Sequence, residues 1–359
     1  MKKILKILGI LLLILVIAVL TYVGYVYFSY DRIEDNQKLE VKTQNSSAEK
    51  VQIGKNYRIV SYNIGFGAYT QDFSFFMDGG ESSRAKDKDS VIKTVTGSAN
   101  NLTALNPDFA MIEEVDLHST RSYHVNQYDL LQTAFNKDKA FNSTFAINYD
   151  SAYLFYPIQQ PHGKSKSGIA FFAKAPITSS LRRSFPISTS FSKFFDLDRC
   201  YIVSRIPVEN GKELVCISVH MSAYGHDENI RKGQIGMLVD EMNREYAKGN
   251  YVIIGGDFNH DLKSKGTNNQ VADWAFPFPR EELPNHFSLA IDTLSEEEKN
   301  ALWDTCRFTD MPYIPGKTQT ITLDGFILSD NIKIKNYDTY KTEYMYSDHE
   351  PVYMDFELK

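Results

Sequence analysis

The residues best suited to chemistry in this sequence follow a short apolar segment. Residues 251–254 are apolar or β-branched and predict a buried strand, and Gly255 and Gly256 then let the backbone approach a neighbouring group closely. Asp257 and Asn259 follow on the same side of an extended chain, because side chains alternate with a period of two. A carboxylate beside an amide at a strand end can orient a water molecule and hold an anion. The alternative is an ordinary turn after a core strand, since these residue types also favour turns.

Other apolar segments end on polar residues of the same kind, namely Asn63, Glu114, His220, Asp324, and Asp348 with His349. If these strand ends lie at one rim of packed sheets, the side chains meet in a single site. Carboxylate, amide and water oxygens suit Mg²⁺ or Mn²⁺, and the sequence has no cysteine and histidine clusters with zinc spacing. Histidine can move protons or donate to phosphate near neutral pH. The set predicts metal-assisted attack of water on phosphorus.

Three features within this set have two interpretations. Glu113 and Glu114 are adjacent, and on a regular strand their carboxylates point to opposite faces, so only one can serve a given site. Residues 162–167 are small and basic, which suits a phosphate-facing loop and equally a solvated hairpin turn. His220 at a strand end is either catalytic or structural.

Taken in order, these residues make residues 55–359 similar to the endonuclease/exonuclease/phosphatase superfamily, which includes pancreatic-type deoxyribonucleases, abasic-site endonucleases, bacterial sphingomyelinases and inositol polyphosphate phosphatases. The resembling motifs are Ser-Tyr-Asn63-Ile, Ile-Glu-Glu114-Val, Gly168-Ile-Ala-Phe-Phe-Ala-Lys174-Ala-Pro-Ile, Val-His220-Met, Gly-Gly-Asp257-Phe-Asn259, Leu-Asp324-Gly-Phe-Ile and Ser-Asp348-His349-Glu-Pro-Val. The resemblance selects Glu114 over Glu113. Gly65 stands where some members have a further Asp.

The resemblance implies a four-layer α/β/β/α sandwich, in which two mostly antiparallel sheets pack together with helices outside. It also implies a cofactor, because the family residue that matches Glu114 binds a divalent metal. Glu114 would bind Mg²⁺ or Mn²⁺, helped by Asn63 and by Asp348.

The catalytic roles are likewise implied by the resemblance. Asp257 and Asn259 would position the attacking water and a phosphate oxygen. His349, held by Asp324, would take a proton from water or stabilise the phosphorane. His220 would contact phosphate or protonate the leaving oxygen.

Hydrophobic spacing and turn residues predict the elements that position these side chains. Strands are expected at residues 57–63, 108–115, 143–149, 168–174, 199–207, 214–220, 251–254 and 320–328, with a last strand after Pro351. Residues 199–207 and 214–220 form a hairpin around Glu209-Asn-Gly211. Helices are expected at residues 91–105, 119–135, 230–246 and 295–306, the last with a capping box of Ser295 and Glu298. Residues 66–88 lack periodicity and predict a long loop at a functional rim.

The N-terminal segment predicts a membrane anchor. Residues 7–30 carry no charge and are long enough to cross a bilayer as a helix. Three lysines precede this segment and acidic residues follow it, so residues 1–6 are expected in the cytoplasm and residues 55–359 outside. Residues 31–54 are polar and predict a flexible tether. The alternative is a cleaved signal peptide, but no small-x-small cleavage site follows the apolar run. The expected location is the cell membrane, as a single-pass protein.

Composition narrows the class of substrate only slightly. The chain has 359 residues, 43% of them hydrophobic, and a net charge of −6, which argues mildly against tight binding of duplex nucleic acid. Its three cysteines allow one disulfide but not a disulfide scaffold, and Cys216 lies in an apolar run typical of a core.

Three functions remain open at this level. The first is a membrane-tethered phosphoesterase acting on a phospholipid or a small phosphate ester. The second is an extracellular nuclease that cleaves DNA or RNA, and the third is a catalytically silent binding module, which the complete residue set disfavours. Residues 274–279, with Trp274 and two phenylalanines among prolines, suit either an apolar surface at the membrane interface or core packing. Nothing in the sequence indicates an obligate protein partner.

Overall fold

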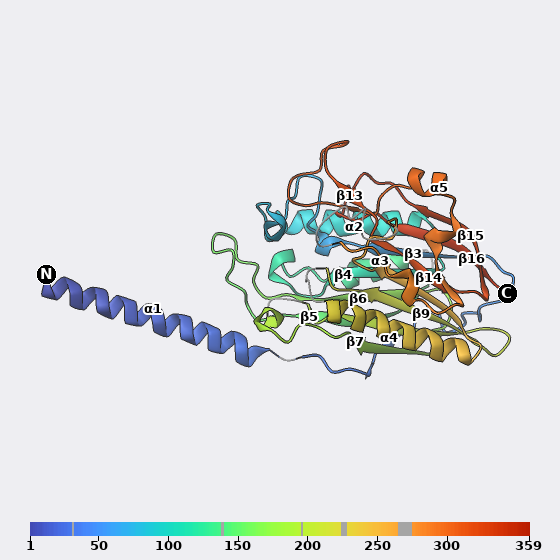
Figure 1. Ribbon diagram of the computed structural model, residues 1–359, viewed down its shortest axis with the longest axis horizontal. Helices are drawn as coiled ribbons and strands as arrows, with labels where there is room; N and C mark the ends of the chain where they lie inside the picture. The colour runs from blue at the N-terminus through green and yellow to red at the C-terminus, as the bar shows by residue number, and fades with distance from the viewer. Residues whose placement is uncertain (31, 138–139, 195–196, 224–227, 265–274) are drawn as a thin grey trace.

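The computed structural model describes residues 1–359 except 31, 138–139, 195–196, 224–227 and 265–274. Helix α1 (Lys2–Ser29) extends away from a domain formed by the later residues (Figure 1). Its side chains are exposed along most of its length. Among the described residues, α1 is the one helix long and apolar enough to cross a membrane, judged by length and composition.

The domain contains two seven-stranded sheets, and most neighbouring strands in them are antiparallel. The first sheet has the order β1 (Gln37–Lys38), β7 (Ser179–Ser184), β8 (Cys200–Pro207), β9 (Glu213–His220), β10 (Tyr251–Asp257), β14 (Asp324–Ser329), β11 (Phe287–Leu289). The second has the order β15 (Ile332–Thr339), β16 (Val352–Leu358), β3 (Tyr57–Asn63), β4 (Phe109–Asp116), β6 (Lys166–Ala173), β5 (Asn142–Asp150), β2 (Val41–Lys42). Strand β9 runs parallel to β10, and β3 runs parallel to β4.

The two sheets pack face to face and share one apolar core, with a helical layer on each outer face. A Cβ on Gly255 of β10 would lie 2.8 Å from Met111 Sδ of β4. The absence of a side chain at Gly255 therefore allows the two sheets to approach closely, as the sequence predicted. Helices α2 (Lys88–Ala104) and α3 (Gln127–Phe135) cover the second sheet, and α4 (Glu228–Ala247) covers the first (Figure 1). The four-layer sandwich implied by the resemblance is confirmed.

Strand register places the functional side chains at one end of the sandwich. In the first sheet, Asp257 at the end of β10 pairs with His220 at the end of β9 and with Asp324 at the start of β14. In the second sheet, Asn63 at the end of β3 pairs with Glu113 of β4. The expected gathering of strand ends at one rim is therefore a consequence of the observed register.

The segment predicted as a flexible tether differs from that expectation. Within residues 31–54, β1 adds to the edge of the first sheet and β2 to the edge of the second, and Val51 is buried beside Val208. Short, polar edge strands carry too little hydrophobic periodicity to be recognised in a sequence. This segment therefore fastens α1 to both sheets.

Several element boundaries also differ from the prediction. The helix expected at residues 119–135 is a 3-10 turn (Thr120–Ser122) followed by α3. The strand expected at residues 320–328 is divided into β13 (Thr320–Ile321) and β14, because β13 leaves the first sheet to pair with β12 (Cys306–Arg307). Helix α5 (Glu296–Ala301) begins with the predicted capping box but ends before residue 306. All three cysteines are buried and free.

Candidate active site

A cavity of about 380 Å³ opens at the rim where the strand ends meet. Six of the predicted site residues line it, namely Glu114, His220, Asp257, Asn259, Asp348 and His349. The other two lie directly behind: Asn63 hydrogen-bonds Glu114 and Asp257, and Asp324 hydrogen-bonds His349. The structure therefore brings all eight predicted residues together, from six strand ends and loops that are distant in the sequence.

The turn after β10 fixes Asp257 and Asn259. Asp257 Oδ1 accepts a hydrogen bond from the Asn259 backbone N–H at 2.9 Å, and Asn259 Nδ2 donates to the Met221 carbonyl at 2.8 Å. Asn259 has a left-handed φ of 49°, which strains a residue with a Cβ and is common at functional sites. A Cβ on Gly256 would lie 2.0 Å from the Val219 carbonyl oxygen, so only glycine fits there. The Gly-Gly-Asp-Phe-Asn sequence is thus required by close packing as well as by chemistry.

His349 and Asp324 form a buried hydrogen-bonded pair. His349 Nδ1 lies 2.7 Å from Asp324 Oδ2, and Asp324 is completely buried. Burial lowers the pKa of His349, but the negative charge of Asp324 and its hydrogen bond raise it more, and the net pKa lies well above the usual value. The buried pair therefore favours the protonated form of His349, whose Nε2 lies 3.9 Å from Asp257 Oδ2.

Asp257 is set to exchange a proton near neutral pH. Burial raises its pKa, His349 lowers it and Asp324 raises it, which gives a value of about 7. A carboxyl group with such a pKa is matched to general-base work at physiological pH. Its Oδ2 also accepts a hydrogen bond from Asn63 Nδ2 at 3.2 Å.

His220 is neutral, in contrast to His349. Burial and then the positive charge of Arg199 hold its pKa well below the usual value. The Asn148 side-chain amide lies 3.4 Å from His220 Nδ1. His220 Nε2 lies 3.6 Å from Asp257 Oδ2 and faces the cavity, where it can donate to an anion.

A bulge in β4 gives Glu113 and Glu114 different positions from those of a regular strand. The pairing of β4 with β6 shifts register between Ile112 and Val115, and Glu114 has a φ of 55°. Glu114 thereby reaches the cavity, whereas the carboxyl group of Glu113 is buried and has no hydrogen-bond partner among the described residues. Burial and then the charges of Asp324 and Asp257 hold the pKa of Glu113 well above its usual value. The sequence predicted that Glu113 and Glu114 point to opposite faces of a regular strand. In the bulged strand, the carboxyl groups of both residues lie near the catalytic groups.

The donor set at Glu114 and Asp348 fits a hard cation. Burial raises the pKa of Asp348, His349 lowers it and the nearby charge of Glu114 raises it, which gives a net value of about 6. Two repelling carboxylates at one cavity wall are the arrangement that a divalent cation stabilises. Asn63 presents its amide nitrogen to Glu114 at 3.3 Å, which orients that carboxylate, and ligation through the Asn63 oxygen stays a prediction.

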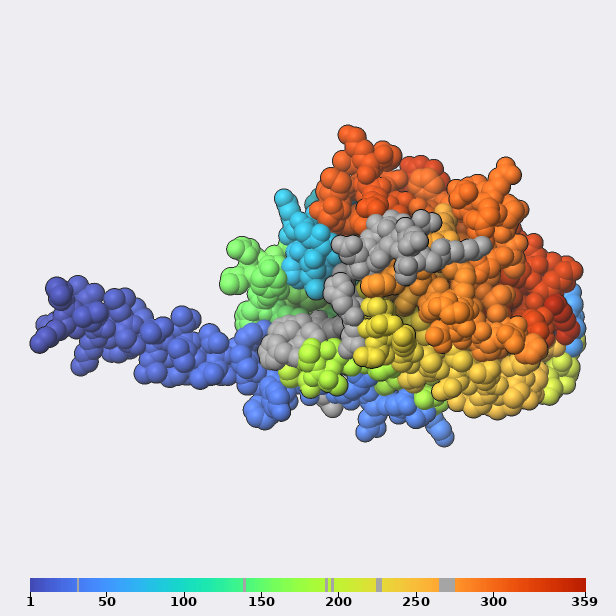
Figure 2. Space-filling model, in the orientation of Figure 1, coloured from blue at the N-terminus to red at the C-terminus, as the bar shows by residue number. Residues whose placement is uncertain are grey.

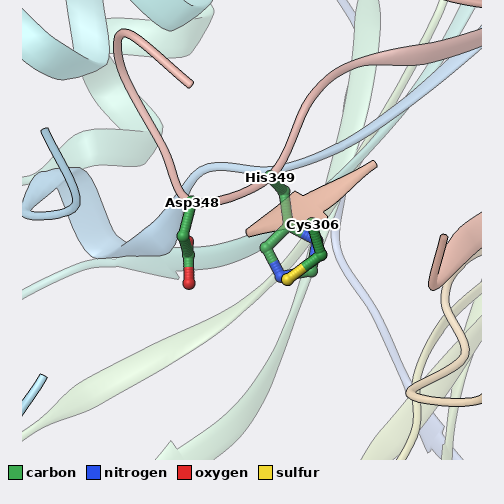
Figure 3. Close-up of side chains that lie close together, drawn as sticks. All are labelled: Cys306, Asp348 and His349. Carbon is green, nitrogen blue, oxygen red and sulfur yellow. The ribbon is translucent and has the colours of Figure 1, made fainter. Parts of the chain in front are cut away.

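Cys306 lies beside the same groups. Figure 3 shows its side chain next to the His349 ring, with Asp348 beyond, and the three offer ligand atoms within 4.8 Å of one another. Burial raises the pKa of the Cys306 thiol to about 12, so the sulfur is protonated at neutral pH. The Cys306 thiol therefore packs in its neutral form against His349.

Arginine side chains complete the cavity, and the sequence analysis missed them. Arg199 and Arg121 are buried and line the cavity. Arg121 is paired with Asp116 at 2.9 Å, whereas Nε and Nη1 of Arg199 have no hydrogen-bond partner in the described part of the chain. The predicted hairpin could have revealed Arg199. Arg199 is the first residue of the hairpin and His220 is the last, so the antiparallel pairing places both at the same edge of the sheet.

His162 also lines the cavity. Residues 162–167, which are small and basic, are therefore only partly a solvated turn. His162 Nδ1 lies 3.1 Å from the Ser83 carbonyl, and burial together with Arg121 lowers the pKa of His162 to about 4. The histidine therefore faces the site in the neutral form.

A family model described as the endonuclease/exonuclease/phosphatase family matches residues 60–349. The chain belongs to this family. Members of the family are phosphoesterase hydrolases that generally use divalent metals. The matched residues extend from β3 to His349 and so include every strand end that contributes to the cavity.

Solved structures show the same fold at low sequence identity. Truncated *Caenorhabditis elegans* TDP2 is 16% identical with a TM-score of 0.52, and the match covers 85% of this chain and 98% of that one. The human nocturnin catalytic domain with bound sulfate is 15% identical with a TM-score of 0.53, covering 89% and 97%. A *Beutenbergia cavernae* endonuclease/exonuclease/phosphatase is 14% identical with a TM-score of 0.56, covering 85% and 72%. No curated protein matches the sequence.

Proposed function

We propose that the protein hydrolyses phosphodiesters with the help of a divalent cation, Mg²⁺ or Mn²⁺. The observation that carries the proposal is the pairing of His349 with buried Asp324 beside Asp257, whose pKa is about 7. This arrangement provides a base and a fixed positive charge at one wall of a cavity.

In the proposed mechanism, Asp257 orients a water molecule and accepts its proton as the water oxygen attacks phosphorus. Asn259 helps to position the phosphate. Neutral His220 donates a hydrogen bond from Nε2 to a phosphate oxygen as negative charge develops on it. The bond from phosphorus to the leaving oxygen then breaks, and the leaving oxygen takes its proton from the imidazolium of His349. Arg199 holds the same phosphate through its unpaired guanidinium nitrogens.

Glu114 and Asp348 hold the cation in this proposal, and Asn63 orients Glu114. The bound cation supplies neutralisation of the charge that develops on the phosphorane and on the leaving oxygen. The raised pKa of Asp348, caused first by burial and in part by Glu114, supports this site, because a cation relieves the repulsion between the two carboxylates.

We further propose that α1 tethers the enzyme to the cell membrane and that the domain lies outside the cytoplasm. The lysines before residue 7 and the acidic residues after residue 30 support this orientation. Protease added to intact cells should digest the domain, and the protein should sediment with membranes. A soluble product beginning near residue 31 would show instead that the segment is cleaved.

An extracellular nuclease is the second candidate. The observation that favours it is the set of three buried arginines that line the cavity, Arg121, Arg199 and Arg307, which suits a polyanion. A *Danio rerio* TDP2 structure with the same fold, 13% identical with a TM-score of 0.54, is described as a complex with a single-strand DNA product.

Turnover of a generic substrate tests the proposed chemistry. The full chain in detergent should hydrolyse bis-p-nitrophenyl phosphate with Mg²⁺ or Mn²⁺, and His349→Ala or Asp257→Ala should each reduce kcat by about 10³-fold or more. His286→Ala is the matched control, because His286 also pairs with an aspartate, Asp330 at 2.8 Å, but lies exposed outside the cavity. Near-normal rates in both site variants would show that the site is misassigned.

Substrates compared in parallel then separate the two candidates. Plasmid DNA, RNA, sphingomyelin vesicles and inositol phosphates should be assayed at one salt concentration with Mg²⁺. DNA cleavage that falls steeply with salt, without lipid turnover, would favour the nuclease over the lipid phosphodiesterase.

A further inference from the structure

The C-terminal part of α1 is bound to one loop of the domain. The Tyr22 hydroxyl donates to the Tyr153 carbonyl at 3.2 Å and accepts from the Phe155 N–H at 3.3 Å. The Tyr25 hydroxyl accepts from the Tyr153 N–H at 3.1 Å, and the Tyr22 ring packs edge-on against Phe155 with centroids 5.2 Å apart. Apolar contacts continue this junction at Val26, Ala152 and Phe194. The helix and the loop are therefore fixed relative to each other.

This loop has an exposed apolar tip. Residues 151–163 contain no Asp, Glu, Lys or Arg, and Phe155, Tyr156 and Ile158 are 54%, 71% and 82% exposed. Backbone hydrogen bonds between Leu154 and Gly163 close the loop at its base. Figure 2 shows the green segment around residue 150 at the same end of the domain as α1. Adjacent exposed apolar side chains on a fixed loop mark an interaction site.

The length of α1 sets the depth of this loop in a bilayer. A hydrocarbon core of about 30 Å needs about 20 helical residues, so a core that begins at Ile7 ends near residue 26. Tyr22 and Tyr25 then lie within about 6 Å of the outer boundary of the core, near which tyrosine is enriched. The backbone of residues 153–155 lies at the same depth, because it is hydrogen-bonded to these two tyrosines. Irregular backbone is excluded from the core itself, which places the loop among the lipid headgroups.

The same loop borders the catalytic cavity. His162 near its base lines the cavity, as does Met77, which is 59% exposed. The Tyr156 ring lies 5.7 Å from that of Phe76, whose neighbour Phe75 also lines the cavity. The loop therefore forms part of the rim of the cavity.

We propose that residues 153–158 form a membrane-contacting loop that sets the cavity mouth against the bilayer, so that the site takes phosphodiesters of lipid headgroups. The membrane contact requires only that α1 crosses the bilayer, whereas the substrate class rests on the proposed function. Phe155, Tyr156 and Ile158 enter the boundary between headgroups and acyl chains, as interfacial aromatic residues do. Lipid is favoured over a protein partner because α1 itself carries the loop to this depth.

Quenching by brominated lipid tests the membrane contact without any enzymatic activity. Tyr156→Trp in the full chain, reconstituted in phosphatidylcholine nanodiscs, should show emission that acyl-chain-brominated lipid quenches beyond the wild-type background. Ile158→Trp should behave alike. Ile53→Trp is the matched control, because Ile53 is also exposed. The next residue, Gly54, donates a backbone hydrogen bond to Leu358 near the C-terminus, which lies at the end of the domain away from α1 (Figure 1). Equal quenching at the loop and at the control position, or none at the loop, would overturn the proposal.

Turnover separates the substrate class from the proposed chemistry. The combined Phe155→Ser, Tyr156→Ser and Ile158→Ser variant should lose about tenfold in sphingomyelin or phosphatidylcholine turnover in bilayers, because binding scales with the apolar area that enters the interface. Its hydrolysis of soluble bis-p-nitrophenyl phosphate should be unchanged. A wild type that cleaves the soluble ester but neither lipid would overturn the lipid assignment. A wild type that cleaves nothing would overturn the proposed function and leave the quenching result to decide the membrane contact.

Discussion

Replacing Asp324 with asparagine removes one negative charge from behind His349 and keeps the shape of the side chain. Asp324 is fully buried, with Oδ2 2.7 Å from His349 Nδ1. A hydrogen bond to a charged group contributes about 1.5–3 kcal/mol. Loss of one preorganised donor to the developing oxyanion raises the barrier by about 2.7–4 kcal/mol. Because these effects overlap, we expect Asp324→Asn to lower kcat by about 10²–10⁴-fold.

The same substitution should also lower the stability of the fold. Asp324 raises the pKa of His349, so the protonated ring is stabilised in the folded state and loses its buried partner in the variant. The charge of Asp324 also raises the pKa of Asp257 and Glu113, so its removal offsets part of this loss. The midpoint of thermal unfolding should therefore fall, and kcat should be compared well below that midpoint.

The assay is steady-state hydrolysis of bis-p-nitrophenyl phosphate at saturating Mg²⁺, combined with calorimetry of the same preparations. Asp330→Asn is the matched control, since it removes the carboxylate partner of a histidine, His286, that is exposed to solvent. A variant with kcat within about threefold of the wild type and an unchanged unfolding midpoint would refute the role assigned to Asp324. An unfolding midpoint equal to that of the wild type would contradict the stabilising role of the buried pair.

Three further predictions concern the cavity, the fold and the junction with α1. Arg199→Gln should lower kcat/KM by about 30–100-fold in steady-state assays, with partial recovery in Arg199→Lys, and an unchanged value would remove Arg199 from phosphate binding. Glu245→Gln breaks a 2.7 Å pair with Arg205 and should lower the unfolding free energy in urea by about 3 kcal/mol, whereas equal stability would contradict the importance of the pair. Burial raises the pKa of Glu245, but Arg205 and other partners lower it to about 2. The contribution of Glu245 to wild-type stability should therefore be complete above pH 4.5 and be lost as the pH falls from 4.5 to 2. The variant should lose less stability over this pH range. Combined Tyr22→Phe and Tyr25→Phe should weaken lipid quenching at the loop tip by releasing the loop, and undiminished quenching would show that other contacts fix its depth.

Much of the site could be predicted because each functional residue lies at or near one end of a recognisable apolar strand. Period-two alternation and paired glycines identified Asp257 and Asn259, and the register of β9, β10 and β14 brings His220 and Asp324 beside them. Packing of strand ends at one rim then accounts for the cavity. The fold follows from the same order of strands and helices.

Features that depend on tertiary contacts were not predictable. The bulge that gives Glu113 and Glu114 their positions depends on how β4 pairs with β6, and the sequence of two adjacent glutamates does not specify it. The short edge strands β1 and β2 form because two sheet edges are available, so their polar sequence indicates only a tether. Of the aromatic insertion, Phe278 is buried and Phe276 is covered by Arg231, which agrees with core packing, and Trp274 lies outside the described residues.

Metal dependence of phosphodiester hydrolysis is the most direct test of the central claim. Full-length protein should be freed of metal with EDTA, assayed on bis-p-nitrophenyl phosphate, and assayed again after addition of Mg²⁺ or Mn²⁺, in parallel with Glu114→Gln. We predict turnover that vanishes on chelation, returns with the added ion, and requires a much higher ion concentration in the variant. Turnover that survives exhaustive chelation, or an identical ion dependence in Glu114→Gln, would contradict the account.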